Sequence, residues 1–294
     1  MNSSPQGTEL IRALVDSEAL KVAPATEVFW YTSGKVGPYY INTHYLFGGP
    51  QEATALLQFI ETNADPDSAT FAGQLQERIE GMYAQDQRYR GVIDRLAETA
   101  TSLAESYDYV SGGQRRDWFF SIAVAGLLQR PHLYLYKDLS ATLASGENGA
   151  QVPAGDLRGS TAVHVADLVT EASSYLRSWI PALRDRGAEM GAAINVVDRA
   201  QGGIAAIRGQ GVGAAALLRV DGSLFDALLD AGLVDATQHQ RLHAYFQDPD
   251  AAMKQFLEDN PNFVQDALNG DDPRTAQRAR LLVEEDLYGL NPGG

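Results

Sequence analysis

Hydroxyl and acidic side chains gather in the run Asp167–Ser174 (DLVTEASS), directly after an apolar stretch rich in β-branched residues. The pattern predicts a strand that ends on the Asp167 carboxylate, then a short turn and the start of a helix. Backbone N–H groups at a helix start, together with Thr170, Ser173 and Ser174, can bind an anion such as a phosphate group. Asp167 beside them could hold ribose hydroxyls or water on a metal ion. The simpler alternative is that Ser173 or Ser174 only caps the helix.

A second group of candidate residues follows another short apolar run, in the range Ser111–Arg116 (SGGQRR). Glycine lets the backbone approach a ligand closely, and guanidinium groups recognise phosphate through paired hydrogen bonds. A phosphate-binding loop is therefore one interpretation. A surface turn whose arginines pair with nearby acids explains the same residues equally well.

Two further segments carry candidate binding residues. The aromatic-rich run Phe29–Asn42 contains a Ser33-Gly34-Lys35 turn, although its aromatic side chains could simply cover a core as a hairpin. Asp198-Arg199 ends another apolar run. We favour ligand contact there over a turn held by an internal ion pair, because strand ends form the binding edge of a parallel sheet.

The candidate residues lie where short apolar runs end, and these runs alternate with helical patterns. Strands are predicted over 107–111, 132–137, 162–167, 192–198 and 214–220, and helices over 117–128, 173–186 and 202–209. This alternation predicts a parallel sheet with helices on both faces. Because ligands bind outside the carboxyl ends of such strands, the sheet would bring the polar residues, Lys137 included, to one edge.

The flanking regions are predicted to be helical. Residues 51–105 and the acidic tail after 223 show apolar residues at helical spacing, with Pro-containing breaks in the tail. Between two predicted strands, the segment Leu139–Gly159 is small, polar and rich in glycine. Its length and lack of periodicity indicate either a lid or a disordered loop.

Composition excludes several classes of function. The chain has 23 Lys and Arg against 38 Asp and Glu, a net charge of −15, which argues against nucleic acid as a partner. Absence of cysteine excludes disulfides, thiolate metal sites and thiol nucleophiles. No signal peptide or membrane span is evident, so a cytoplasmic protein without membrane partners is expected. Lysine is scarce, and the four present are Lys21, Lys35, Lys137 and Lys254.

The histidines give no strong signal for a metal site. His239 and His243 are four residues apart on a predicted helix and could form a ligand pair, but no third ligand is evident. We therefore expect two exposed histidines and no metal held by protein side chains. His132 and His164 lie inside predicted strands, where packing is the expected role.

Taken in order, these segments resemble the orotate phosphoribosyltransferases, which have the type I phosphoribosyltransferase fold. The family's N-terminal pattern is similar to Ala19-Leu20-Lys21, Phe29 and Ser33–Tyr40, and its pyrophosphate loop corresponds to Ser111–Gly113. Its phosphoribosyl-diphosphate motif corresponds to Ala166–Ser174, and its orotate-contacting arginine to Arg199. The resemblance covers roughly residues 8–48 and 106–222.

The resemblance implies an α/β fold with a mostly parallel five-stranded sheet, helices on both faces and an N-terminal hood. To this the chain adds a helical insert and a helical C-terminal tail. The expected divisions are 1–50 for the hood, 51–105 for the insert, 106–222 for the α/β core and 223–294 for the tail.

The implied activity is transfer of phosphoribosyl from phosphoribosyl diphosphate to a pyrimidine base, orotate above all, by a homodimer. Mg²⁺ would be held mainly through the diphosphate. Catalytic positions implied by the resemblance are Arg115, Arg116, Lys137 and Asp167, the last holding ribose hydroxyls. The diphosphate substrate would be bound by Ser111, Gly112, Gly113, Thr170, Glu171, Ala172, Ser173 and Ser174. Arg199 and the turn of Ser33, Gly34 and Lys35 would contact the base.

The sequence departs from the family pattern at positions that matter for turnover. Ala166 replaces the first acid of the motif, and Ala172 replaces its glycine. The family's lid brings a lysine and usually a histidine over the pyrophosphate, whereas Leu139–Gly159 contains neither. Two functions thus remain open: an enzyme in which Arg115 and Arg116 compensate, or a degenerate relative that binds phosphoribosyl diphosphate or a nucleotide as a sensor or accessory protein.

Overall fold

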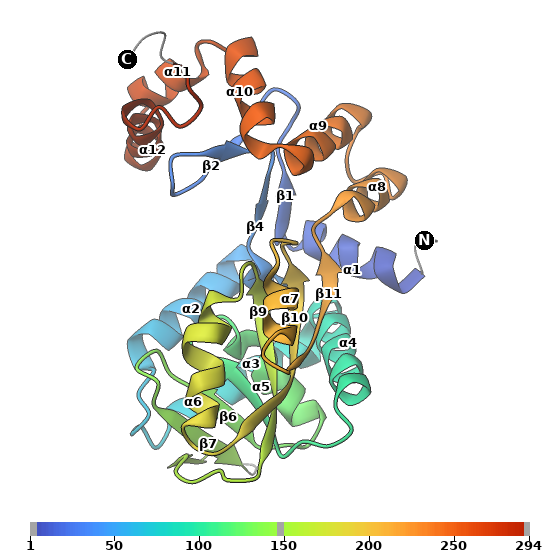
Figure 1. The fold of residues 1–294 in the computed structure, drawn as a ribbon, viewed down its shortest axis with the longest axis vertical. Coiled ribbons are helices and arrows are strands. Elements are labelled where there is room, and N and C mark those ends of the chain that lie inside the picture. The colour runs from blue at the N-terminus through green and yellow to red at the C-terminus, as the bar shows by residue number, and fades with distance from the viewer. Residues whose placement is uncertain (1–4, 146–149, 291–294) are drawn as a thin grey trace. The chain divides into compact units, whose positions relative to one another are not determined.

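The computed structural model describes residues 5–145 and 150–290 (Figure 1). Part of the predicted lid, 146–149, and the ends of the predicted hood and tail, 1–4 and 291–294, lie outside the described residues. The chain divides into two compact units. Within the described residues, the sheet unit comprises 5–19, 42–145 and 150–220, and the tail unit comprises 20–41 and 221–290. The predicted boundaries at 50/51 and 105/106 therefore fall inside the sheet unit.

A seven-stranded sheet forms the centre of the sheet unit, in the order β11-β10-β9-β5-β6-β7-β8. The first five strands in this order are mutually parallel, as predicted. Their bounds are β5 Tyr109–Gly113, β6 His132–Leu135, β9 Thr161–Val169, β10 Glu189–Asp198 and β11 Gly213–Arg219. The mostly parallel α/β fold predicted from the alternating pattern is confirmed.

Of the two alternatives for Leu139–Gly159, a lid or a disordered loop, the disordered loop is wrong for the part that the structure describes. Strands β7 (Ala141–Ser145) and β8 (Ala150–Pro153) form an antiparallel hairpin that continues the sheet beyond β6. Ala141, Thr142 and Ala144 are buried, while Leu143 is half-buried. Because the buried positions carry such small residues, the alternation that marks a strand is too weak to read from the sequence.

Helices cover both faces of the sheet (Figure 1). On one face, α5 (Trp118–Leu127) lies against β5, β6 and β9, and the insert adds α3 (Phe71–Gln85) and α4 (Gln87–Leu103) around it. On the other face lie α6 (Ile180–Arg184), preceded by the π-helical turn Tyr175–Trp179, and α7 (Gly203–Arg208). The remaining helical segments of this unit are α1 (Pro5–Asp16), the 3-10 turn Thr43–Leu46 and α2 (Pro50–Asn63).

Large aromatic side chains fill the core between the insert and the sheet. Tyr89, Trp118, Phe119 and Phe120 are fully buried, and the Tyr89 hydroxyl donates a hydrogen bond to the Phe119 carbonyl. The insert predicted to be helical is thus an integral part of the sheet unit, because its apolar stripe buries the outer face of α5.

The tail unit joins the N-terminal strands to the C-terminal helices. Strand β1 (Leu20–Val22) pairs with β4 (Tyr39–Ile41), and β2 (Phe29–Trp30) with β3 (Val36–Gly37). The C-terminal part folds into α8 Gly222–Asp230, α9 Ala236–Gln247, α10 Pro249–Asp259, α11 Phe263–Asn269 and α12 Pro273–Glu284. Its core contains Val28 and Val36 together with Met253, Leu257 and Leu282. No helix in the described ranges combines the length and the apolar character needed to cross a bilayer.

Close packing at the end of β5 yields a stability prediction. A Cβ atom on Gly113 would lie 2.3 Å from the Trp179 ring and 2.8 Å from the Asp117 carboxylate. Gly113→Ala should therefore lower the free energy of unfolding by about 1–3 kcal/mol. Gly126→Ala is the matched control, because nothing lies within 4 Å of that position and alanine favours a helix. Urea denaturation measures both, and equal effects would contradict the packing described.

Candidate functional site

The carboxylate of Asp117 lies between two parallel strands at the point where they separate. Strands β5 and β9 pair from Tyr109↔Ala162 to Ser111↔His164. Beyond this pair, the N–H of Gly113 donates to Asp117 Oδ2 at 3.1 Å, and the N–H of Asp167 donates to Oδ1 at 3.2 Å. One side chain thus satisfies backbone donors of both strands, and the carboxyl ends of the strands can diverge around it.

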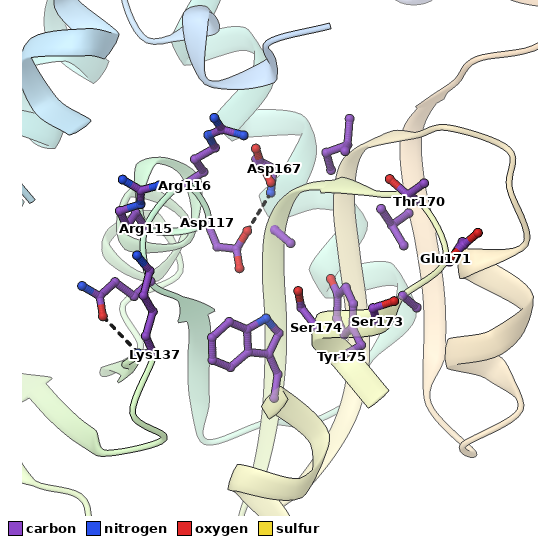
Figure 2. Close-up of a pocket in the computed structure, with 16 residues that line it drawn as sticks. Arg115, Arg116, Asp117, Lys137, Asp167, Thr170, Glu171, Ser173, Ser174 and Tyr175 are labelled. Atoms are coloured by element: carbon purple, nitrogen blue, oxygen red, sulfur yellow. Dashed lines mark hydrogen bonds between the residues drawn. The ribbon is translucent and has the colours of Figure 1, made fainter. Parts of the chain in front are cut away.

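A polar pocket of about 450 Å³ opens at this divergence (Figure 2). Its wall on the β5 and β6 side is formed by the range 114–117 and Lys137, and the opposite wall by the range 166–175. Figure 2 shows the basic side chains of the first wall facing the hydroxyl-bearing turn of the second, with Asp117 and Asp167 between them. A pocket therefore opens at the edge of the sheet where the candidate residues were predicted to gather.

The wall formed by 114–117 and Lys137, called the basic wall below, contains three cations that differ in their partners and exposure. Arg115 forms an ion pair with Glu61 of α2, which the surface-turn interpretation had predicted for both arginines. Arg116 is exposed, and so is Lys137, whose backbone N–H donates to the Gln114 side chain at 3.0 Å. The peptide bond between Gln114 and Arg115 is cis. Arg116 and Lys137 are consequently the cations placed to meet an anionic ligand.

The turn from Thr170 to Ser174 forms the opposite wall. Ala172 is buried and adopts φ 61°, the left-handed conformation that usually requires glycine. Its carbonyl accepts a hydrogen bond from Leu176 at 3.0 Å, and the Thr170 carbonyl accepts one from Gly203 at 2.9 Å. Ser174 makes no side-chain capping bond to the helical segment that follows it. The capping alternative does not hold for Ser174, whose hydroxyl faces the pocket.

Asp167 is the titratable group most perturbed by the pocket. Burial and the repulsion of the neighbouring Asp117 carboxylate together raise the pKa of Asp167 to about 7, while Arg116 opposes the shift. Such a carboxyl changes its charge near neutral pH. A cation or a hydroxyl donor placed against it would favour the ionised form.

Two residues next to the pocket were not predicted from the sequence. Asp117 directly follows the arginine pair, which is the only sequence signal it carries. His44 lies on the 3-10 turn and packs against the Phe119 ring at 6.0 Å. Burial lowers the His44 pKa to about 4, with Arg116 and Arg115 adding repulsion, so the imidazole is neutral beside the basic wall. Nothing in the spacing around His44 indicates this placement.

The predicted loop Ser111–Gly113 does not line the pocket. All three are buried in β5, and the Ser111 hydroxyl is 3.0 Å from His164 Nδ1. A Cβ on Gly112 would lie 2.1 Å from the Ser121 hydroxyl oxygen. Packing against α5 and Trp179 is sufficient to require both glycines, and their contact with a ligand stays a prediction. His164 is fully buried, and His132 is buried as well, so packing is confirmed for both.

Arg199 follows β10 and does not line the pocket. Its backbone N–H donates to Val169 at 2.9 Å. The Asp198 carboxylate accepts from the Ala200 N–H at 2.9 Å and lies 4.0 Å from Arg219. Within the described residues, the Arg199 Nε atom is enclosed without a hydrogen-bond partner. An internal ion pair between Asp198 and Arg199 therefore does not account for this turn.

The predicted base-contacting turn belongs to the tail unit. Lys35 Nζ lies 2.7 Å from Asp250 Oδ1, and a Cβ on Gly34 would lie 2.8 Å from Leu281 of α12. Gly34 has φ 83°, and its N–H donates to the Tyr31 carbonyl. Ser33 is exposed. The C-terminal helices thus hold this turn in shape, and a role in base contact stays a prediction.

Comparison with known proteins bears on the fold. Neither family models nor curated proteins match the sequence. Among solved structures, UMP synthase from Leishmania donovani matches 84% of this chain with TM-score 0.52 and 17% identity. Orotate phosphoribosyltransferase from Francisella tularensis matches 81% with TM-score 0.50 and 14% identity. The fold is that of the type I phosphoribosyltransferases. The chain spans 42% of the Leishmania protein and 96% of the Francisella protein.

In this phosphoribosyltransferase fold, the half-buried Asp167 beside the Asp117 carboxylate makes stability depend on pH. Below the pKa that this carboxyl has in the unfolded chain, near 3.8, it does not lower the free energy of unfolding. Above that pH the destabilisation grows, and it is complete once the pH exceeds the raised pKa of about 7. Asp167→Asn removes it. The variant should exceed the wild type in free energy of unfolding by a few kcal/mol, of order ~2–4, at pH 8, and the difference should vanish near pH 4. Denaturation at both pH values measures this, and a pH-independent difference would contradict the assigned shift.

The left-handed conformation of Ala172 gives a second prediction. A β-branched side chain is strained at φ 61°, so Ala172→Val should lower the free energy of unfolding by about 2 kcal/mol or more. The free energy of unfolding of Ala172→Gly should stay within ~1 kcal/mol of the wild type. Glycine relieves the backbone strain in the folded state, but it also adds conformational entropy to the unfolded chain, and the two effects oppose each other. If both variants unfold at the same urea concentration, the turn does not have this conformation.

Proposed function

We propose that this chain is a phosphoribosyltransferase that transfers the phosphoribosyl group of phosphoribosyl diphosphate to a pyrimidine base, orotate above all. The observation that carries the proposal is the pocket in which Arg116 and Lys137 face the Thr170–Ser174 turn across Asp167. A ligand with phosphate at two ends and a sugar between them matches this arrangement, in which cations and the hydroxyl-bearing turn lie on opposite walls and a carboxyl lies between them. The fold shared with the two solved structures and the sequence resemblance both support it.

Each wall would hold a different part of that substrate. The N–H groups and hydroxyls of Thr170, Ser173 and Ser174 would bind the 5′-phosphate, helped by the start of the helical segment. Asp167 would accept hydrogen bonds from the ribose hydroxyls, which favours its ionised form. Arg116 and Lys137 would face the diphosphate, where the negative charge increases as the bond breaks.

The reaction exchanges one bond at the ribose C1 for another. The bond to the diphosphate oxygen breaks, and diphosphate leaves with the electron pair. The base nitrogen forms the new bond to C1 and gives up its proton to solvent. Oriented cations lower the barrier by stabilising the leaving charge in a site that is already organised for it. Mg²⁺ fits these residues as an ion carried by the diphosphate and neutralising part of its charge, because it prefers oxygen ligands and keeps several waters. Asp167 is the carboxylate that could reach one of those waters.

A second function, binding without turnover, is favoured by one specific observation. The family's lid places a lysine and usually a histidine over the pyrophosphate, whereas residues 139–159 contain neither. In the described part of this segment, β7 and β8 are hydrogen-bonded into the sheet. Loss of one charge-stabilising donor costs about 10²–10³ in rate, so the chain would bind phosphoribosyl diphosphate as a sensor or accessory protein if nothing compensates.

Orotate consumption and diphosphate release, measured with phosphoribosyl diphosphate and Mg²⁺, test the proposal. Arg116→Met and Lys137→Met should each lower kcat/KM by about 10²-fold, because each removes a cation from the leaving group. Arg130→Met is the control. Arg130 lies just before β6, at the amino ends of the parallel strands and away from the pocket, and it packs on Tyr107. Calorimetric binding without diphosphate release would establish the second function instead. Absence of both binding and turnover would overturn both.

A further inference from the structure

Three potential metal ligands come together in the tail unit, on two neighbouring helices. His239 and His243 lie one turn apart on α9, and Asp226 lies on α8. The Nε2 atoms of the two histidines are 2.7 Å and 3.0 Å from the same oxygen, Asp226 Oδ1. The third ligand that the sequence did not reveal is thus supplied by the preceding helix, across the connection 231–235.

The convergence of these atoms suits a metal ion. Each residue offers one ligand atom, and the three atoms all lie within 4.8 Å of one another. Ligand atoms around a tetrahedral zinc ion, at about 2.0–2.1 Å from it, are separated by about 3.3 Å. Small rotations of the side chains would therefore place all three atoms around one ion. The side chains of His239 and His243 are 21% and 33% exposed, so solvent and an ion can reach them.

Further contacts hold the start of α9 and the His243 ring in place. Asp235 begins α9 with a capping box, in which its carboxylate accepts from the Gln238 N–H at 2.8 Å and its own N–H donates back to the Gln238 side chain at 2.9 Å. The His243 ring packs against Phe225 at 5.6 Å, and a Cβ on Gly222 would lie 3.0 Å from its Cε1 atom. The ligand set is therefore largely organised before any ion arrives, which lowers the entropic cost of binding.

We propose that Asp226, His239 and His243 bind a divalent transition-metal ion, with Zn²⁺ as the representative. Two imidazoles and one carboxylate match the preference of such ions, whereas Mg²⁺ and Ca²⁺ prefer oxygen ligands alone. Asp226 is exposed, so a fourth position is left open for water. This site is independent of the proposed transferase function, since it involves a different ion and no residue of the polar pocket.

An ion at this position would cross-link α8 to α9. Because it would bind the folded chain and not the unfolded one, it would stabilise the tail unit in proportion to its concentration above Kd. The melting temperature of the tail unit should therefore rise by several degrees in excess Zn²⁺, and the rise should depend on all three ligands.

Calorimetric titration of the full chain, first treated with a chelator, with ZnCl₂ in a phosphate-free buffer tests the proposal. The wild type should bind one equivalent, and Asp226→Asn and His243→Gln should each weaken binding at least tenfold. Asp230→Asn is the matched control, because it removes the same charge from the same helix at an exposed position outside the cluster. Its affinity should equal that of the wild type.

His239→Gln separates metal binding from folding. Glutamine can keep a hydrogen bond to Asp226 but is a poor ligand for zinc, so this variant should fold as the wild type does and still lose affinity. Cobalt provides a second readout, since Co²⁺ bound by these residues should give intense visible absorption bands that the three ligand variants lack. Absence of one-equivalent binding by the wild type, or equal affinity in the wild type and the ligand variants, would overturn the proposal.

Discussion

The pocket of this protein depends on one carboxylate, that of Asp117, inserted between two parallel strands. Pairing of β5 with β9 ends at Ser111 and His164, and beyond that point Asp117 accepts the N–H groups that would otherwise have no partner. A buried donor without a partner is costly, so strands that diverge need such an acceptor. The same side chain anchors the loop with Arg115 and Arg116. Divergence of the strands and placement of the cations therefore have a common physical cause.

The second consequence of Asp117 is electrostatic. A carboxylate that satisfies backbone donors also repels the carboxyl of Asp167, whose pKa burial and this repulsion raise to about 7. Arg116 partly offsets the repulsion, and it adds to the effect of burial in lowering the pKa of the nearby His44. The pocket thus holds two carboxyl groups that repel each other, at a cost in stability, which is a usual arrangement in a ligand-binding site. In a chain with only four lysines, Lys137 is the one that lines this pocket, and arginine supplies the other cations.

Sequence patterns predicted what depends on local periodicity and strand ends. The five parallel strands and the hydroxyl-rich wall from Thr170 to Ser174 follow from apolar runs and from the polar residues that end them. Features that depend on contacts between distant segments could not be predicted in this way. Gly112 and Gly113 are required by Ser121 and Trp179, the β7–β8 hairpin has a weak pattern of small residues, and Asp226 meets His239 and His243 only after two helices pack together.

The most direct measurement of the central claim is the number of protons released when magnesium phosphoribosyl diphosphate binds at pH 7. Calorimetric titrations in buffers of different ionisation enthalpy give this number for the wild type and for Asp167→Asn. If ligand hydroxyls favour the ionised form of a carboxyl whose pKa is raised to about 7, the wild type should release more protons than the variant. Equal release by the two proteins would contradict the role assigned to the Asp117–Asp167 pair.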